Sequence, residues 1–225
     1  MSCPRENLRS DRTQLLAHAE LSDYAGCYII QFGSAPIVSL PDNDVESYRH
    51  VVVGWQSGVV WQPSVIQTAF HERIEKIIGP AFIGYTDANL FRQGPTNSLV
   101  RAITDEDEEA FGILRDACPT EDWDHGGSTF RPEQMAGVFT EKSLVALASY
   151  QIWGANIAHI SIVTHPGFRG CRYATIAVSE LTRIVLQRKL VPQYRTLEAN
   201  QPSMLVAARI GFVRYATSLA VRFKS

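Results

Sequence analysis

Residues 158–187 constrain the fold of this chain more than any other segment. The stretch AHISIVT at 158–164 alternates apolar Ile160 and Ile162 with polar His159 and Ser161, which is typical of a strand. After an intervening turn, apolar residues recur at helical spacing: Ala177, Val178, Leu181, Ile184 and Val185. Polar residues are expected on the opposite helix face: Ser179, Glu180, Arg183, Gln187 and Arg188. The pattern predicts a strand, a turn and a helix that packs on a sheet.

The turn at residues 165–172 has the composition of an anion site. The first amides of a helix have no partner within the helix and carry partial positive charge, so they bind phosphate well. Gly170 allows the backbone to approach an anion closely, and Arg169 and Arg172 add fixed charge. A diphosphate fits this arrangement; the alternative is a tight turn with solvated arginines. The nucleotide-binding motifs GxxxxGK[ST] and GxGxxG do not occur at this turn.

The first part of the chain has a mixed pattern of short elements. We expect a helix at 7–20, short apolar strands that include residues 50–55, and a helix at 63–78 that Gly79 and Pro80 end. A further strand at 81–85 precedes a linker at 86–98. Residues 1–97 are therefore predicted to form an N-terminal α/β extension or small subdomain.

A second series of elements begins near residue 98. Thr104 and Asp107 have the spacing of a capping box at the start of a helix. Two strands joined at Gly154 are expected before the strand–turn–helix, and a strand at 194–200 after it. A short helix capped by Gly211 and one or two closing strands complete the pattern. These elements predict an α/β fold with a mixed sheet for residues 98–225.

Composition excludes several classes of protein. The 225 residues carry a formal net charge of -2, which argues against a protein that coats nucleic acid. The 4 cysteines are far apart, so neither a disulfide framework nor a metal site is expected. No segment has the roughly 20 apolar residues that span a bilayer, and no apolar signal core opens the chain. We expect a cytoplasmic protein without membrane, nucleic-acid or metal partners.

The turn resembles a motif of the GNAT superfamily of N-acetyltransferases, [QR]-x-x-G-x-[GA]. The matching frame runs from Arg169 to Ala174, with Arg172 in place of the central glycine. Downstream, Asn200, Ser203 and the Gly211–Phe212 pair resemble a second family pattern at the expected spacing. The order of elements also matches, and the resemblance covers residues 98–225.

This resemblance implies an acetyltransferase that takes acetyl-CoA as its co-substrate. The thioester would lie where the strands at 158–164 and 194–200 separate. The cofactor-binding residues that the resemblance implies are Ile162, Val163, Thr164, Arg169, Gly170, Cys171, Arg172, Tyr173, Ala174, Thr175, Asn200 and Ser203. The acceptor is an amine that attacks the thioester directly, so no protein nucleophile is required.

Direct attack requires a base for the acceptor ammonium and an acid for the thiolate. Glu198 and His159 are the candidate bases, with Glu198 preferred because it precedes Asn200 by two residues on one strand face. The family often places its acid, a tyrosine, where this chain has Ala207, and Ser203 is a substitute candidate. Residues 121–128 would border the acceptor; the alternative is a surface loop with a packed tryptophan.

Two functions follow from these residues. The first is N-acetyl transfer to a primary amine of a small molecule or a protein. The alternative is a degenerate acyl-CoA-binding module with a regulatory or partner-binding role and no transfer activity, which Arg172 and Ala207 favour slightly. A homodimer is compatible with either function.

Overall fold

The chain folds into two compact units, each built from separate parts of the sequence. The computed structural model describes residues 11–18, 24–55, 58, 61–95, 99–141 and 143–224. Unit 1 comprises Met1–Ile83, Thr196–Asn200 and Arg214–Ser225, and unit 2 comprises Gly84–Arg195 and Gln201–Val213. The domain boundary expected after residue 97 remains a prediction.

Unit 1 contains a small mixed sheet. Its strands are β1 (Gln14–Ala17), β2 (Gly26–Gln31), β3 (Pro36–Leu40), most of β4 (Ile74–Tyr85) and most of β10 (Val213–Phe223). Strand β3 pairs with β1 in parallel and with β2 antiparallel, and β2 pairs antiparallel with β10. Strand β4 follows β10 in the hydrogen-bonded order.

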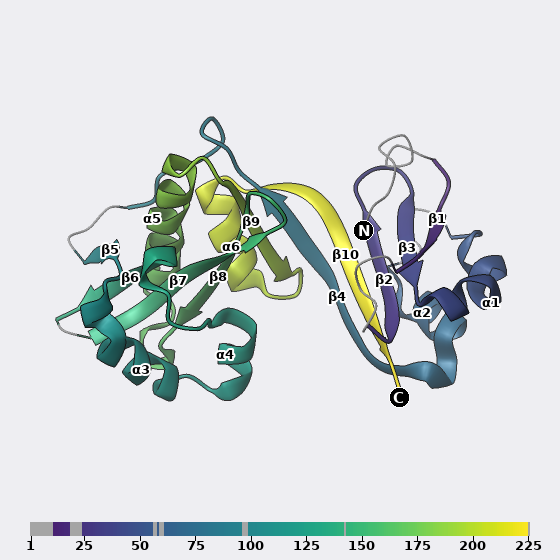
Figure 1. Cartoon of the computed structure of the whole chain (residues 1–225), viewed down its shortest axis with the longest axis horizontal. Helices are drawn as coiled ribbons and strands as arrows, with labels where there is room; N and C mark the ends of the chain where they lie inside the picture. The colour runs from purple at the N-terminus through teal and green to yellow at the C-terminus, as the bar shows by residue number, and fades with distance from the viewer. Residues whose placement is uncertain are drawn as a thin grey trace. The chain divides into compact units, whose positions relative to one another are not determined.

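Two helices complete unit 1 and bury an apolar core with the sheet. Helix α1 (Asp42–Val52) and helix α2 (Pro63–Phe70) lie beside the purple and blue strands in Figure 1. The core contains Ile29 and Val38 from the sheet and Val52, Ile66 and Phe70 from the helices. Aromatic rings also pack in this core, where the ring centroids of Phe70 and Phe223 are 5.2 Å apart.

Three expectations for the first part of the chain are wrong. Part of the helix expected at 7–20 lies outside the described residues, but Gln14–Ala17 form strand β1. Residues 50–52 end helix α1 instead of forming a strand. The helix expected at 63–78 stops at Phe70, and the isoleucines after it belong to the 12-residue strand β4, which continues through Gly79 and Pro80. In the first and third cases sheet pairing overrides a local apolar pattern that fits either element, whereas residues 50–52 continue the helix that begins at Asp42.

Unit 2 is built on five strands in the order β9-β8-β7-β6-β5. They are β5 (Val100–Ala102), β6 (Met135–Thr140), β7 (Ser143–Trp153), β8 (Ile157–Thr164) and β9 (Val191–Leu197). Neighbours pair antiparallel from β5 to β8, whereas β8 and β9 are parallel. This mixed sheet confirms the predicted fold class.

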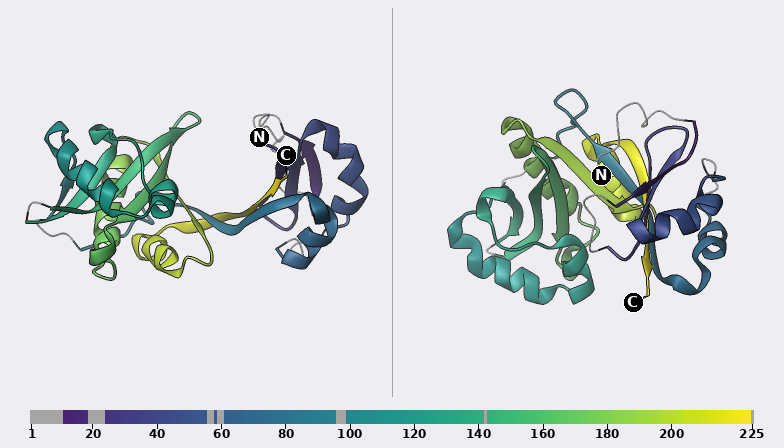
Figure 2. Two further views of the ribbon diagram at one scale, coloured as in Figure 1. Left: turned by 90° about the horizontal axis from the view of Figure 1, so that it is seen from below. Right: turned by 45° about the vertical axis from the view of Figure 1, so that its right-hand side comes forward.

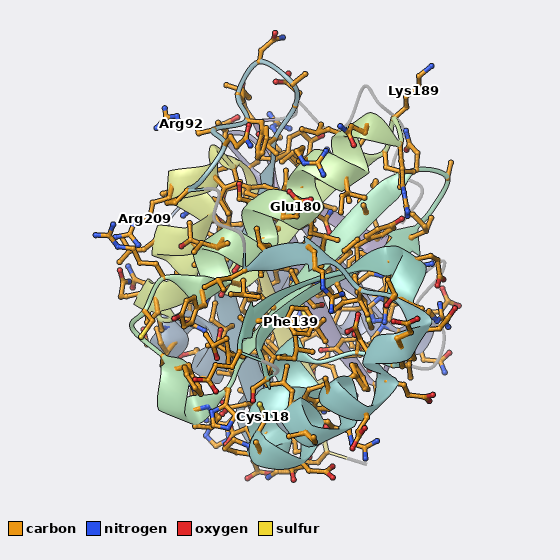
Figure 3. All side chains as sticks on the ribbon, turned by 90° about the vertical axis from the view of Figure 1, so that its left-hand side faces the viewer. Arg92, Cys118, Phe139, Glu180, Lys189 and Arg209 are labelled. Carbon is orange, nitrogen blue, oxygen red and sulfur yellow. The ribbon has the colours of Figure 1, made fainter. Side chains whose placement is uncertain are left out.

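Helices cover both faces of this sheet. Helix α3 (Glu108–Ala117) and helix α4 (Thr120–Gly126) lie on one side, and α5 (Tyr173–Gln187) lies on the other (Figures 1 and 2). Helix α6 (Gln201–Ile210) packs beside α5. The core under α3 includes Phe111, Leu114 and Val163, together with Cys118 and Phe139, which Figure 3 labels.

Several local predictions for residues 98–225 are confirmed. Strands β7 and β8 are joined by a turn at Gly154, which has φ 59°. Thr104 and Asp107 form the predicted capping box, and Asp107 also accepts two hydrogen bonds of 2.6 Å from Arg101. The Arg101 guanidinium is the main reason that the pKa of Asp107 is lowered to about 2. One helix residue differs from expectation: Ser179 is buried and accepts a 2.8 Å hydrogen bond from the Gly94 amide.

No helix among the described residues is long and apolar enough to cross a membrane. In the same residues, no group of three or more His, Cys, Asp and Glu side chains is placed to hold a metal ion.

Gly211 provides a test of this fold. Its φ is 93°, and a Cβ added there would lie 2.0 Å from the Leu90 carbonyl oxygen. Gly211→Ala is expected to lower the free energy of unfolding by at least about 2 kcal/mol, because left-handed strain and a steric clash act together. Urea denaturation measures this loss.

Gly112→Ala is the matched control. Gly112 lies within α3, and a Cβ added there would meet no heavy atom within 4 Å. Since alanine is the better helix former, this variant is expected to gain about 0.5–1 kcal/mol. Equal effects of the two substitutions would contradict the close approach at Gly211.

Candidate active site

The turn between β8 and α5 holds two residues in the left-handed conformation. Gly170 has φ 81°, and Arg172, the residue before the first helical position of α5, has φ 65° and ψ 9°. Arg172 therefore adopts a conformation that favours glycine, at the position where the resemblance expected one. The backbone adopts this geometry although the residue is an arginine.

The start of α5 presents main-chain donors. The first hydrogen bond into the helix runs from the Ile176 amide to the Arg172 carbonyl, at 3.2 Å. The amides of Tyr173, Ala174 and Thr175 precede it and have no partner within the helix. Tyr173, Ala174 and Thr175, the last three residues of the predicted cofactor turn, thus form the first turn of helix α5.

The side chains of the turn differ in their partners. Arg169 donates a hydrogen bond of 2.6 Å to a carboxylate oxygen of Asp122 in α4, and both side chains are about half exposed. Arg172 is exposed and makes no side-chain cap hydrogen bond to α5. Cys171 is exposed, with its sulfur 3.8 Å from the Arg169 carbonyl oxygen. Sequence reasoning missed Asp122, which lies 47 residues before Arg169.

The parallel strands β8 and β9 pair over only part of their length. The register runs from Ile157 opposite Val191 to Ile160 opposite Tyr194, and both strands continue beyond it. The His165 amide donates to Val145 in β7 at 2.9 Å. By alternation, the main-chain groups of Ile162 and Thr164 point away from β7, toward the opposite edge of β8. This is the strand edge expected to bind the pantetheine arm.

The end of α4 reaches the same strand edge. A Cβ built on Gly126 would lie 2.3 Å from the Ile162 carbonyl oxygen, so only glycine allows this approach. Within α4, Trp123 packs against Phe111 with ring centroids 5.4 Å apart. Residues 121–126 are thus a short helix with a packed tryptophan. Trp123 also lines a surface groove of about 470 Å³ with Phe111 and Phe130.

His159 lies in β8 directly opposite Gln193 in β9. Its Nδ1 is 2.9 Å from the Gln193 amide oxygen, and its ring stacks on Trp153 at 3.8 Å with an interplanar angle of 13°. Burial lowers the pKa of His159; the hydrogen bond to Gln193 opposes this shift, and the charge of Arg195 adds to it. The imidazole is therefore held neutral under conditions in which an exposed histidine is partly charged.

Glu198, the other candidate base, belongs to unit 1. Its carboxylate accepts a hydrogen bond from the Arg214 guanidinium, which also lies over the ring of Phe82 at 5.1 Å. Thr217 donates to the same carboxylate at 3.4 Å. Asn200 belongs to the same unit, and its main-chain N–H donates a hydrogen bond of 3.0 Å to the Leu197 carbonyl oxygen. The Glu198 carboxylate thus already has an arginine and a threonine as hydrogen-bond partners.

Ser203 stands in the first turn of α6 and bonds to a buried phenol. Its hydroxyl lies 2.8 Å from the hydroxyl of Tyr194. Burial raises the pKa of Tyr194 to about 12, against the smaller lowering effect of Ser203. Ala207, at the position where the resemblance expected a tyrosine, is buried at 1 % exposure. Sequence reasoning missed Tyr194, because its contact with Ser203 depends on how α6 packs on β9.

Comparisons with known proteins agree with this geometry. Residues 130–217 match the family model described as GNAT acetyltransferase, a segment that contains the turn, both parallel strands and α6. The resemblance to the GNAT superfamily is confirmed. No curated protein matches the sequence.

Solved GNAT structures resemble the chain in fold. A GNAT-family acetyltransferase from Colwellia psychrerythraea is 15% identical, with TM-score 0.52 over 71% of this chain and 61% of that protein. A GCN5-related N-acetyltransferase from Kribbella flavida is 15% identical, with TM-score 0.51 over 87% and 69% of the two chains. A GCN5-related N-acetyltransferase from Sphaerobacter thermophilus is 14% identical, with TM-score 0.52 over 70% of this chain and 55% of that protein. The match therefore spans little more than half to about two thirds of each of these GNAT proteins. The GNAT fold supports acetyl transfer in general.

The left-handed Arg172 gives a stability test that needs no ligand. Arg172→Gly is expected to raise the free energy of unfolding by about 0.5–1 kcal/mol, because relief of roughly 1–2 kcal/mol of strain exceeds the entropy cost of glycine. Arg172→Ala removes the same charge but keeps the strain, so its stability should stay within about 0.5 kcal/mol of wild type. Urea denaturation of the three proteins compares them. A loss of stability in the glycine variant would contradict the strained turn.

Proposed function

We propose that the protein is an N-acetyltransferase that moves an acetyl group from acetyl-CoA to a primary amine of a small molecule or a protein. The observation that carries this proposal is the turn before α5, where two left-handed residues precede three helix amides. An N-terminus with this geometry suits the pyrophosphate of a CoA molecule. The family match over residues 130–217 supports the same donor.

The cofactor-binding residues would act mainly through the main chain. The amides from Gly170 to Thr175 would bind the pyrophosphate, with the guanidinium groups of Arg169 and Arg172 beside them. The strand edge formed by residues 162–164 would hydrogen-bond the pantetheine arm. Asn200 and Ser203 are proposed to contact the same arm, as the resemblance implies.

Transfer would proceed by direct attack. The acceptor ammonium first gives a proton to a base, and its nitrogen then bonds to the thioester carbonyl carbon. The carbon–sulfur bond breaks as the nitrogen gives up its second proton to water, which leaves a neutral amide. The CoA thiolate takes a proton from water or from Ser203, and water returns a proton to Ser203. Positioning of the two reactants supplies much of the rate acceleration, and the base makes the amine reactive at neutral pH.

His159 is the base that we now prefer. Burial lowers the pKa of its imidazole and so favours the neutral form, and the residue lies in the unit that holds the cofactor turn. Glu198, which the sequence favoured, is ion-paired to Arg214 and belongs to the other unit.

Cofactor binding provides the first test. Arg169→Ala is expected to weaken acetyl-CoA binding by about 1.5–3 kcal/mol in calorimetry, as charge-assisted hydrogen bonds are lost. Arg172→Gly should also bind more weakly, and its affinity should depend less on salt. Arg172→Ala separates charge from conformation, because it should match the glycine variant in affinity. Unchanged affinity in Arg169→Ala, or tighter binding in Arg172→Gly, would count against the proposed cofactor turn.

Turnover provides the second test. His159→Gln is expected to lower kcat/KM by about 10²–10⁴-fold and to leave acetyl-CoA affinity nearly unchanged. Glu198→Gln is the parallel variant, and a smaller effect is expected there. The measurement is thiol release at pH 6 to 10 with a panel of amines and peptides. If neither substitution slows turnover, the base is another group or solvent.

The alternative function has two observations in its favour. Arg172 occupies the glycine position of the motif, and the buried Ala207 occupies the position of the usual acid. A protein that binds acetyl-CoA and acetylates no amine or peptide in the panel would be an acyl-CoA-binding module.

A further inference from the structure

Three polar side chains form a continuous chain of hydrogen bonds across unit 2. His159 in β8 contacts Gln193 in β9 at 2.9 Å, and the Gln193 amide nitrogen lies 2.5 Å from the hydroxyl of Tyr85 at the end of β4. Gln193 is buried, with 6% of its surface exposed. The parallel register places His159 and Gln193 directly opposite each other.

The chemistry of the amide determines which atom carries each proton. An amide oxygen only accepts hydrogen bonds, and an amide nitrogen only donates them. Because the Gln193 oxygen faces Nδ1 of His159, that nitrogen must carry a proton. The Gln193 nitrogen then donates to the Tyr85 hydroxyl, which accepts. In a neutral imidazole of this tautomer, Nε2 holds the lone pair.

Other contacts restrict the ring further. Trp153 stacks on one face of the imidazole and so favours this orientation of the ring plane. Arg195, two residues after Gln193 in β9, is the charged group that acts on the imidazole. Its positive charge opposes a second positive charge on the ring, which keeps the lone pair on Nε2 available.

We propose that Gln193 is a positioning residue that holds His159 in the Nδ1–H tautomer and so makes Nε2 the proton acceptor for the acceptor ammonium. Tyr85 is the second hydrogen-bond partner of the Gln193 amide and helps to hold it in place. This inference rests on the proposed function, in which His159 is the base. When Nε2 takes the proton, Nδ1–H still donates to Gln193, so the hydrogen bond persists in both charge states and nothing must rearrange.

The tautomer can be measured without substrate. In protein labelled with ¹⁵N at histidine, the chemical shifts and long-range proton couplings of the two ring nitrogens identify the protonated one. His159→Gln assigns the signals. The expected result is protonated Nδ1 in wild type and loss of this preference in Gln193→Leu. Protonated Nε2 in wild type would mean that the amide has the opposite orientation, and it would overturn the proposal whatever the activity.

Turnover against pH tests the positioning role. Gln193→Glu still accepts from Nδ1–H, but its negative charge favours the imidazolium. The low-pH fall of kcat/KM should therefore move upward by about one to two pH units. Gln193→Leu, which has no acceptor, should lose roughly 10–100-fold in kcat/KM, the range seen when a partner that orients a functional histidine is removed. Tyr85→Phe should give a smaller loss of the same kind.

Gln151→Leu is the matched control. Gln151 lies opposite His159 on the other side, in β7, and it is exposed. It should keep the pH profile and rate of wild type. Thermal unfolding and acetyl-CoA affinity report whether each variant is folded. Identical pH profiles of kcat/KM for wild type, Gln193→Glu and Gln193→Leu would overturn the positioning role of Gln193. The proposed function is tested separately, by acetyl-CoA binding and by the turnover of His159→Gln.

Discussion

The parallel pairing of β8 with β9 stops at Ile160 and Tyr194, and the groups proposed for function depend on where it stops. Before this point, the register places His159 opposite Gln193, so a histidine and its partner are fixed by main-chain hydrogen bonds. Beyond this point, the main chain of Ile162 and Thr164 continues at an edge that the described pairing with β9 does not cover. One feature of the sheet therefore provides both a firmly held histidine, which is the proposed base, and a strand edge to which an extended ligand is proposed to bind.

The sequence predicted those parts of the fold that local chemistry determines. The hairpin β7–β8, the capping box at Thr104 and the glycine after α6 all depend on residues within a few positions of one another. The errors lie where a short apolar run fits two structures. Residues 74–78 have helical spacing, yet they extend β4, because pairing with other strands satisfies their backbone. The β strand at 14–17 exists through its pairing with β3, which no local pattern reveals.

For the candidate site, the sequence indicated the elements on which the proposed residues lie but not which side chains meet. It identified the turn at 169–175 and named His159, because both can be read from alternation and from helix spacing. The partners of these residues are distant in sequence. Gln193 follows His159 by 34 positions and Asp122 precedes Arg169 by 47, so only the packing of β9 and α4 on β8 brings each pair together. The ion pair of Glu198 with Arg214 likewise requires the course of β10.

The charges at the turn explain why an arginine can replace the motif glycine. Arg169 is bonded to Asp122, and the formal charges of these two side chains cancel. With Arg172 added, the three side chains of Arg169, Asp122 and Arg172 carry a net positive charge. This charge lies next to the helix amides where a pyrophosphate would bind. A glycine would relax the left-handed backbone but would leave the set neutral. Strained residues persist where the surrounding structure fixes them, and here β8 and α5 fix both ends of the turn. The strain at Arg172 is thus the structural cost of a second guanidinium at the turn, beside Arg169, whose charge Asp122 balances.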